Sequence, residues 1–155
     1  MPSTKRHIAI IGSRRFPYTQ VEYDALKEME DLEGIKEGIE IGRKMVKDFV
    51  DRLGRDCVVV SGGAIGPDSW AKEAAEARGI TTKIYPANWE KYGKTAGFKR
   101  NNDIIRNSDD IVAFWDLVSR GTDDTLKKAV KAKKPFAVFG PDGKVVLHMT
   151  EGDYA

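Results

Sequence analysis

Five short apolar runs alternate along the chain with segments of helical periodicity. The runs occupy residues 7–12, 57–62, 80–86, 110–115 and 135–140. Short, nearly uninterrupted apolar runs are typical of strands covered on both faces, as in a parallel sheet. The pattern therefore predicts an α/β protein with a Rossmann-like, doubly wound and mainly parallel five-stranded sheet, with helices on both faces.

Helical periodicity fills the intervals between these strands. Ala71, Ala74 and Ala75 share one stripe and favour a helix that packs tightly on the sheet. We expect helices at residues 67–78, 19–32, 36–53 and 121–132, and another that begins near Ala96. After Gly140, the turn PDGK and the run VVLHM predict a C-terminal hairpin that adds an edge strand. The expected organisation is one domain over 1–155, with its core at 7–140 and a hairpin and tail at 141–155.

Three glycines, Gly34, Gly38 and Gly42, recur every fourth residue and would line one face of a helix. Charged residues lie between them, which excludes a membrane helix. Two interpretations remain open. The glycines belong either to a loosely capped helix junction or to a close-packing face, and that face would serve within the chain or in a homodimer.

Composition and charge narrow the class of protein. The chain has 155 residues and a formal net charge of +2, which gives little sign of a nucleic-acid partner. No stretch has the length and apolar character of a membrane span or a secretory signal, so we expect a cytoplasmic protein with no membrane partner. The single cysteine, Cys57, excludes an internal disulfide. We expect no metal site and no required cofactor.

Glycine and hydroxyl residues follow three of the predicted strands. These turns begin at Gly12, at Ser61 and near Ser119. The carboxyl ends of parallel strands meet at one edge of the sheet, where such folds bind ligands. Glycine exposes backbone N–H groups, a helix N-terminus adds donors, and Arg14 can pair with an anion. The turns therefore predict a site for a phosphorylated small molecule, most simply a nucleotide.

The segment between the third and fourth strands, NWEKYGKTAGFKRNNDIIRN, carries a second set of candidates. Trp89 and Tyr92 offer aromatic surfaces in a predicted loop. Helical spacing places one or both of Asn101 and Asn102 on an inward stripe, where a polar group needs a partner. We consider two roles: an asparagine that ties down a neighbouring loop, or Arg100 and Asn101 reaching the ligand.

Four motifs, in this order, resemble the YspA-like members of the SLOG superfamily: GSRRF, VVVSGGAIGPDSWAKEAA, NWEKYGKTAGFKRN and AFWDLVSRGTDDTLKKA. The resemblance covers about residues 7–140. This superfamily includes the Smf/DprA DNA-processing proteins and the LOG phosphoribohydrolases. The resemblance implies a Rossmann-like nucleotide-binding fold. The ligand-binding residues that it implies are Gly12, Ser13, Arg14, Ser61, Gly62, Gly63, Asp68, Arg100, Asn101, Ser119, Gly121 and Thr122.

Three functions follow from these residues and from the resemblance. The first is binding of a nucleotide-type ligand without chemistry. The second is hydrolysis of an N-glycosidic bond, for which Asp68, Asp116 and Asp123 are the candidate carboxylates. In LOG enzymes the catalytic glutamate belongs to a PGGxGTxxE motif, and here the matching stretch VSRGTDDT has Thr125 at that position. The third is binding of single-stranded nucleic acid, as in Smf/DprA proteins, through the lysines and aromatic residues near Arg100.

Overall fold

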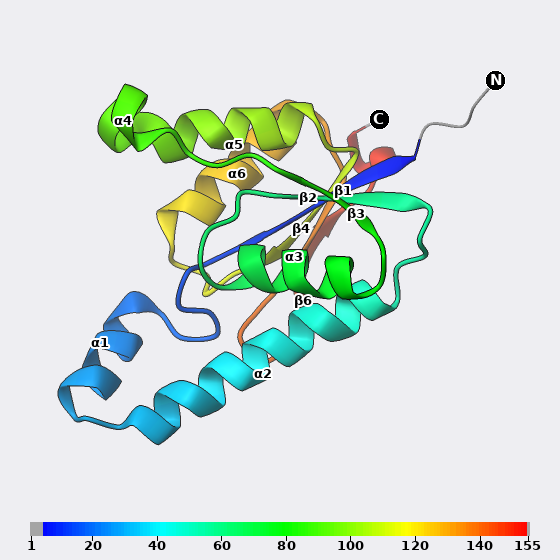
Figure 1. Ribbon diagram of the computed structural model, residues 1–155. Helices are drawn as coiled ribbons and strands as arrows, with labels where there is room; N and C mark the ends of the chain where they lie inside the picture. Colours follow the sequence, from blue (N-terminus) through cyan, green and yellow to red (C-terminus); the bar gives the residue numbers. More distant parts are fainter. Residues whose placement is uncertain (1–4, 155) are drawn as a thin grey trace.

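The computed structural model describes residues 5–154 and shows a sheet with helices on both of its faces (Figure 1). The sheet has six strands in the order β3-β2-β1-β4-β5-β6. They are β1 (Arg6–Gly12), β2 (Cys57–Ser61), β3 (Thr81–Ile84), β4 (Asp110–Phe114), β5 (Phe136–Phe139) and β6 (Val145–Met149). β1 to β5 are parallel and β6 pairs antiparallel with β5. The doubly wound fold and its added edge strand are thus confirmed. The predicted domain limits, residues 1 and 155, lie outside the described residues.

The helices divide between the two faces of the sheet. They are α1 (Gln20–Glu28), α2 (Leu32–Asp51), α3 (Pro67–Ala77), α4 (Trp89–Tyr92), α5 (Ala96–Arg106) and α6 (Arg120–Lys131), with short 3-10 turns η1 (Gly93–Thr95) and η2 (Glu151–Tyr154). α2 and α3 cover one face, and α5 and α6 cover the other (Figure 1). Within residues 5–154, none of the helices has the length and apolar character needed to cross a membrane.

The two faces of the sheet form two separate hydrophobic clusters, because successive side chains of a strand point to opposite sides. On β1, Ile10 is buried beneath α2 and α3, whereas Ile11 is buried beneath α5 and α6. Phe114, at the end of β4, stacks on Phe139 with ring centroids 5.1 Å apart. The two central strands, β1 and β4, therefore contribute side chains to the hydrophobic clusters on both faces of the sheet.

The glycines of α2 pack within the chain. A Cβ at Gly38 would overlap the ring of Tyr18, and one at Gly42 would lie 2.8 Å from the ring of Trp70. Both glycines are buried. Close packing inside the chain is therefore observed for Gly38 and Gly42, whereas Gly34 lies at the capped helix junction, where its N–H donates to Asp31.

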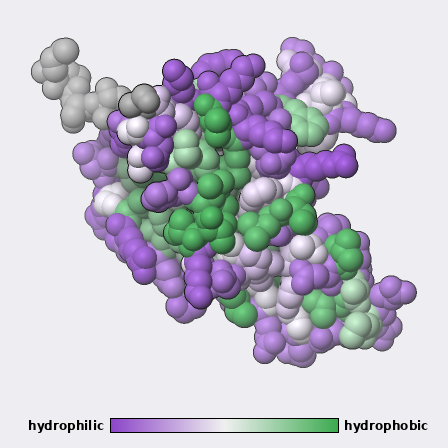
Figure 2. Space-filling model, turned by 180° about the vertical axis from the view of Figure 1, so that it is seen from behind, coloured by the Kyte–Doolittle hydropathy of each residue, from purple (hydrophilic) through white to green (hydrophobic). Residues whose placement is uncertain are grey.

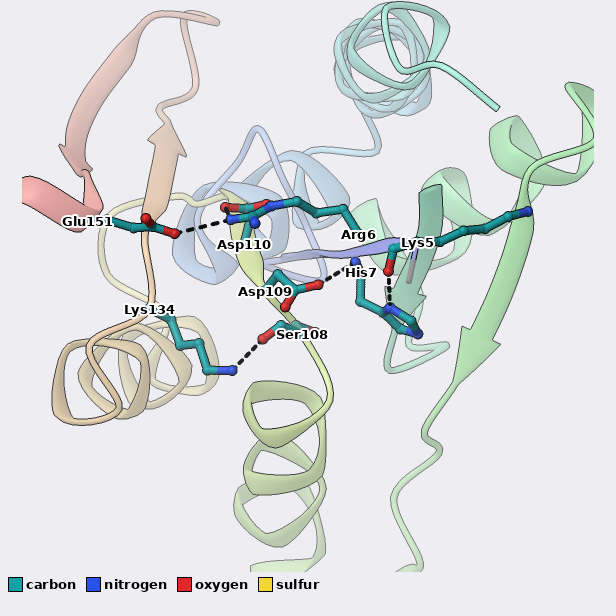
Figure 3. Close-up of polar contacts among 8 residues, drawn as sticks. All are labelled: Lys5, Arg6, His7, Ser108, Asp109, Asp110, Lys134 and Glu151. Carbon is teal, nitrogen blue, oxygen red and sulfur yellow. Dashed lines mark hydrogen bonds and ion pairs between the residues drawn. The ribbon is translucent and has the colours of Figure 1, made fainter. Parts of the chain in front are cut away.

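The amino-terminal rim of the sheet is occupied by the protein's own polar contacts, which Figure 3 shows. Arg6 donates to the carboxylate of Asp110 at 2.6 and 3.0 Å and reaches Glu151 at 3.4 Å. Lys134 donates to the carbonyl of Ser108 at 2.6 Å. These contacts tie the start of β1 and β4 to η2 and to the end of α6. A separate cleft opens at the opposite, carboxyl-terminal rim.

Candidate functional site

A cleft with a volume of about 290 Å³ lies at the carboxyl-terminal rim. Its walls come from the loops after β1 and β4, from α4 and α5, and from the first turns of α3 and α6. β1 and β4 are neighbours, and the strand order runs outward from them in both directions. This is the point at which doubly wound sheets bind ligands.

The structure brings most of the sequence-predicted site residues together around this cleft. The lining includes Gly12, Ser13, Arg14, Asp68, Arg100, Asn101, Asp116, Ser119, Gly121 and Thr122. Ser61, Gly62 and Gly63 are not part of the lining and instead hold the residues at its base. Asp123 also lies outside the lining, and its carboxylate pairs with Lys127 at 2.8 Å.

The N-terminus of α6 presents free backbone donors to the cleft. Ser119 precedes the helix in an extended conformation, but its side chain does not cap the helix. The first intrahelical bond joins the N–H of Asp123 to the carbonyl of Ser119 at 3.3 Å. The N–H groups of Gly121 and Thr122 donate to no residue within 5–154, and both residues line the cleft. A helix start with unpaired N–H groups favours an anion.

Asp116 shapes the loop between β4 and α6. Its Oδ1 accepts the N–H groups of Val118 and Ser119 at 2.9 and 2.7 Å, and its Oδ2 accepts the hydroxyl of Ser119. Its own N–H donates to the Ser13 hydroxyl at 2.9 Å, which links the loops after β1 and β4. Leu117 takes a positive φ of 73° inside this turn. The carboxylate of Asp116 is therefore engaged in loop structure, and the Ser119 hydroxyl is bound to it.

Asp68 is buried in the first turn of α3, at the base of the cleft. Its Oδ2 accepts the N–H of Gly62 at 3.1 Å, and its backbone carbonyl accepts the hydroxyl of Ser61 at 3.0 Å. Burial raises the pKa of this carboxyl to about 6, although Arg100 and nearby backbone N–H groups act in the opposite direction. The Ser61–Gly62 turn thus serves a carboxylate of the protein itself.

Arg100 extends from α5 across the base of the cleft. Its Nη1 donates to the carbonyl of Gly62 at 2.9 Å and its Nε donates to Asn101 at 3.2 Å. A side chain at Gly62 would occupy the space that the guanidinium fills, which explains this glycine. Burial lowers the pKa of Arg100, an effect that Asp68 opposes and Arg14 reinforces. For both Asp68 and Arg100, burial shifts the pKa towards the uncharged form. Their mutual attraction opposes this shift but is the smaller effect.

Asn101 is 6% exposed and connects α5 to α6. Its Nδ2 donates to the carbonyl of Gly121 at 3.4 Å and to the carboxylate of Asp124 at 3.2 Å. The first role considered for Asn101 is therefore observed, because it fixes a neighbouring segment. It also lines the cleft, and its contact with a ligand stays a prediction. The contact with Asp124 was not predicted, although the spacing of Asp124 and Lys128, whose side chains pair at 2.6 Å, could have indicated a polar cluster there.

Positive charge exceeds negative charge in the lining. Four cationic side chains, those of Arg14, Arg15, Lys94 and Arg100, face two carboxylates, Asp68 and Asp116. In the described part of the chain, Arg14 and Lys94 form no ion pair. The cleft therefore carries an excess of positive charge, which favours an anionic ligand.

Aromatic residues form one wall of the cleft. Trp89 and Phe98 line it and are 51% and 45% exposed. The Trp89 ring lies beside Gly97, where a Cβ would be 3.6 Å away. Tyr92 is outside the lining, and its ring is covered by the ammonium groups of Lys91 and Lys99. Among the candidate aromatic residues, Trp89 thus combines a place in the cleft with the largest exposed surface.

Sequence comparison identifies one phage relative. No model of a known protein family matches the chain. Over 99 residues it is 37% identical to the Gene 61 protein of Mycobacterium phage D29, a match that spans 60% of this chain and 79% of that protein. The chain belongs to the family of this phage protein. The cleft described above is therefore the candidate site of a Gene 61-type protein.

Structural comparison finds solved proteins that share the Rossmann-like fold of this Gene 61-type chain. DNA processing protein A from Streptococcus pneumoniae is 16% identical with a TM-score of 0.62, over 87% of this chain and 50% of that chain. The Helicobacter pylori protein of the same name is 23% identical with a TM-score of 0.56, over 97% and 71%. The molybdenum cofactor binding protein from Rippkaea orientalis is 17% identical with a TM-score of 0.57, over 88% and 77%. This chain thus spans half the length of the first neighbour, and the likeness is one of fold.

Thr125, which the sequence motifs match to the catalytic glutamate of LOG enzymes, lines the cleft and is 2% exposed. Its hydroxyl donates to the carbonyl of Gly121 at 3.1 Å. A hydroxyl held in this way cannot take the part of a catalytic carboxylate. Within residues 5–154, no group of three or more His, Cys, Asp or Glu residues is arranged to hold a metal ion.

Proposed function

We propose that this protein binds a phosphorylated small molecule of the nucleotide class in the cleft at the carboxyl-terminal rim. The observation that carries the proposal is the start of α6, where Gly121 and Thr122 line the cleft and their N–H groups have no partner among residues 5–154. A phosphate group would accept these donors and complete the helix start. We also propose, from the sequence motifs, that the chain belongs to the YspA-like subgroup.

The charges around the cleft support a phosphate. Arg14 and Lys94 line it, and both side chains are exposed. Arg14 can form a charge-assisted pair with phosphate oxygens without losing a contact inside the protein. Proteins of the same fold are described as binding single-stranded DNA or the molybdenum cofactor, so ligand binding is compatible with the fold.

The aromatic wall supports a base on the same ligand. Trp89 and Phe98 line the cleft together with the cationic residues. An exposed indole ring offers a flat surface on which a base stacks, a contact worth about 1–3 kcal/mol in nucleic-acid complexes. A molecule with a phosphate at one end and a flat ring at the other, such as a nucleoside monophosphate, matches both features.

The first test removes one positive charge from the cleft. We expect Arg14→Gln to weaken the binding of AMP, measured by calorimetry, by about tenfold, because a hydrogen bond to a charged group contributes about 1.5–3 kcal/mol. Arg55→Gln is the matched control, since Arg55 is an exposed residue before β2, at the opposite rim. Equal effects of the two variants, or no binding of AMP to the unchanged protein, would contradict the proposal.

The second test separates base from phosphate. Trp89→Ala should weaken AMP binding by about tenfold and leave ribose 5-phosphate binding unchanged, because only AMP carries a ring to stack. In the unchanged protein, AMP should also quench tryptophan fluorescence, and Trp89→Ala should remove this quenching, since Trp89 is 51% exposed, Trp70 is buried and Trp115 is partly buried. If ribose 5-phosphate and AMP bind equally and Trp89→Ala changes neither, the ligand is a phosphate compound without a recognised base.

A second candidate function is hydrolysis of a nucleotide's N-glycosidic bond. Its support is Asp68, which lines the cleft and has a pKa raised by burial to about 6, a value suited to proton transfer near neutral pH. Release of free adenine from AMP, abolished by Asp68→Asn, would establish this activity. Binding without release of adenine would leave binding alone as the function.

The third candidate, binding of single-stranded DNA, is favoured by the surface of α4 and α5. Lys91 and Lys99 lie over the Tyr92 ring at 5.2 and 4.8 Å from its centroid. This function requires oligothymidylate binding that weakens steeply with salt and is lost in Lys91→Gln plus Lys99→Gln. Neither residue lines the cleft, so AMP binding in that double variant should be unchanged.

A further inference from the structure

α1 projects from the body of the molecule at the far end of α2 (Figure 1). None of its residues is buried. Its inward side rests on the rest of the chain through Tyr23, whose ring lies 4.2 Å from the guanidinium carbon of Arg15. The helix is held by a capping box between Thr19 and Glu22. Its outer side therefore has no part in the core.

That outer side is apolar. A helix turns about 100° per residue, so Val21, Ala25 and Met29 follow one another along a single stripe, with Tyr23 on the opposite side. Val21 is 80% exposed and Met29 is 72% exposed, and Leu32, where α2 begins, is 64% exposed. In Figure 2 the lobe formed by α1 and the start of α2, at the lower right, shows hydrophobic surface between hydrophilic areas. We call Val21, Ala25, Met29 and Leu32 the α1 stripe.

Acidic residues surround the α1 stripe. Residues 20–34 contain one lysine, Lys27, and six acidic residues: Glu22, Asp24, Glu28, Glu30, Asp31 and Glu33. The net charge of this segment is thus −5, although the whole chain carries +2. The helical positions place Glu22 on one side of the stripe and Asp24 and Glu28 on the other. The α1 stripe is therefore apolar and has carboxylates along both of its sides.

The exposed apolar surface and its acidic flanks together indicate which kind of partner the α1 stripe would bind. Exposed apolar residues aligned on a helix and rimmed by charge are typical of a protein interaction site. A second copy of the same stripe would bring like charges together, and nucleic acid or an anionic membrane would be repelled. A basic amphipathic helix presents an apolar face between rows of lysine or arginine and complements both features. We propose that the α1 stripe docks a basic amphipathic helix of another protein.

The test uses synthetic helices whose binding to the full chain is followed by fluorescence anisotropy. One peptide alternates leucine and lysine at helical spacing, a second has glutamate in place of lysine, and a third is a scrambled form of the first. We expect only the first to bind. Equal binding of the scrambled peptide would show non-specific charge attraction, and binding of the glutamate peptide would show that the acidic flanks do not select the partner. Either result would overturn the proposal.

Variants locate the contact. Val21→Gln plus Met29→Gln should weaken binding of the leucine–lysine peptide by about tenfold or more, since two central apolar contacts are lost. Ile41→Gln plus Val130→Gln is the matched control, because these helical residues are 52% and 47% exposed elsewhere on the surface. Asp24→Asn plus Glu28→Gln should also weaken binding. Circular dichroism and thermal unfolding should be unchanged in all three. Equal affinity of the stripe variant and the control would rule out the stripe.

Sedimentation equilibrium tests whether a second copy of the chain, rather than another protein, occupies the α1 stripe. A dimer of the unchanged protein that dissociates in Val21→Gln plus Met29→Gln would mean that a second copy covers the stripe, and the proposed partner would be wrong. We expect the mass of the unchanged protein and of this variant to be equal. Binding of AMP is a separate property of the cleft and should not respond to these substitutions.

Discussion

The Nη1 of Arg100, in α5, donates a hydrogen bond of 2.9 Å to the carbonyl of Gly62, 38 positions earlier in the chain. This bond joins a helix on one face of the sheet to the turn that ends β2. Asp68 accepts the N–H of the same glycine, so Gly62 is held from both sides. The base of the cleft is therefore a small polar cluster, and its parts depend on one another for partners.

Removal of Arg100 should destabilise the protein through Asp68. Arg100→Met leaves a buried carboxylate without its cation, and we expect the free energy of unfolding at pH 7 to fall by about 2 kcal/mol. Asp68→Asn in addition should recover part of this loss, because the buried charge is then gone. Urea denaturation of the two single variants and the double variant measures the coupling. Strictly additive effects would show that Asp68 and Arg100 act independently.

The pH dependence of stability should carry a contribution from Asp68. Its pKa is about 6 in the folded state against an ordinary value of 3.8, because the carboxyl is buried. The folded chain then binds the proton more tightly than the unfolded chain, so this contribution is fully present below pH 4 and is lost as pH rises through about 6. We expect it to be on the order of 3 kcal/mol, since one pKa unit corresponds to about 1.4 kcal/mol.

Urea denaturation between pH 7 and pH 4 checks this, with Asp68→Asn as the reference. The stability difference between the unchanged protein and the variant should shift in favour of the unchanged protein as pH falls. Comparison with the variant matters because other carboxyls act in the opposite direction, such as Asp153, whose pKa is lowered by its bonds from Thr150. Parallel curves for the two proteins would exclude a raised pKa at Asp68.

The bond between the Asp116 N–H and the Ser13 hydroxyl should position the cleft loops. Ser13→Ala leaves a buried N–H without an acceptor, and we expect a loss of about 1–2 kcal/mol in the free energy of unfolding. AMP affinity should fall as well, because the loops after β1 and β4 are no longer joined. Ser69→Ala is the control: its hydroxyl donates to the Gly66 carbonyl, which also accepts the N–H of Trp70. Similar losses in both variants would argue against a special role for Ser13.

The glycines of α2 and α5 should respond to alanine with opposite sign. Gly38→Ala drives a methyl group into the ring of Tyr18, and we expect a loss of about 1–3 kcal/mol. Gly97→Ala meets nothing closer than the Trp89 ring at 3.6 Å, so the better helix propensity of alanine should stabilise the protein by up to about 1 kcal/mol. Thermal unfolding separates the two. Stabilisation by Gly38→Ala would show that Tyr18 moves aside without cost.

The strands were predictable because their apolar runs are short, uniform and separated by helical segments. Predicted runs at 57–62 and 110–115 became β2, Cys57–Ser61, and β4, Asp110–Phe114. The predicted helix at 19–32 was too long, since α1 ends at Glu28. Asp31 accepts the N–H of Gly34 and caps a new helix. This cap was hard to recognise in the sequence because Asp31 is one of several acidic residues close together.

The gathering of candidate residues at one rim was also predictable, since parallel strands end on the same side. What the sequence could not decide was which donors remain free. The N–H groups of Gly62 and Gly63 donate to the side chains of Asp68 and Ser61, whereas those of Gly121 and Thr122 have no acceptor among residues 5–154. Both turns read alike as glycine with a hydroxyl residue, and only the fold of α3 against β2 brings a carboxylate to the first of them.

The order of apolar and polar residues by itself determined the layers, the parallel sheet and the rim at which a ligand would bind, because these follow from local periodicity and chain direction. Tertiary structure decided the partners. Arg100 donates to the carbonyl of Gly62, and Asp123 lies outside the cleft, paired with Lys127. Tyr18 and Trp70 pack against the glycine face of α2, and the α1 stripe stays exposed. Contacts between distant residues depend on how the elements pack, and no local pattern in the sequence records that packing.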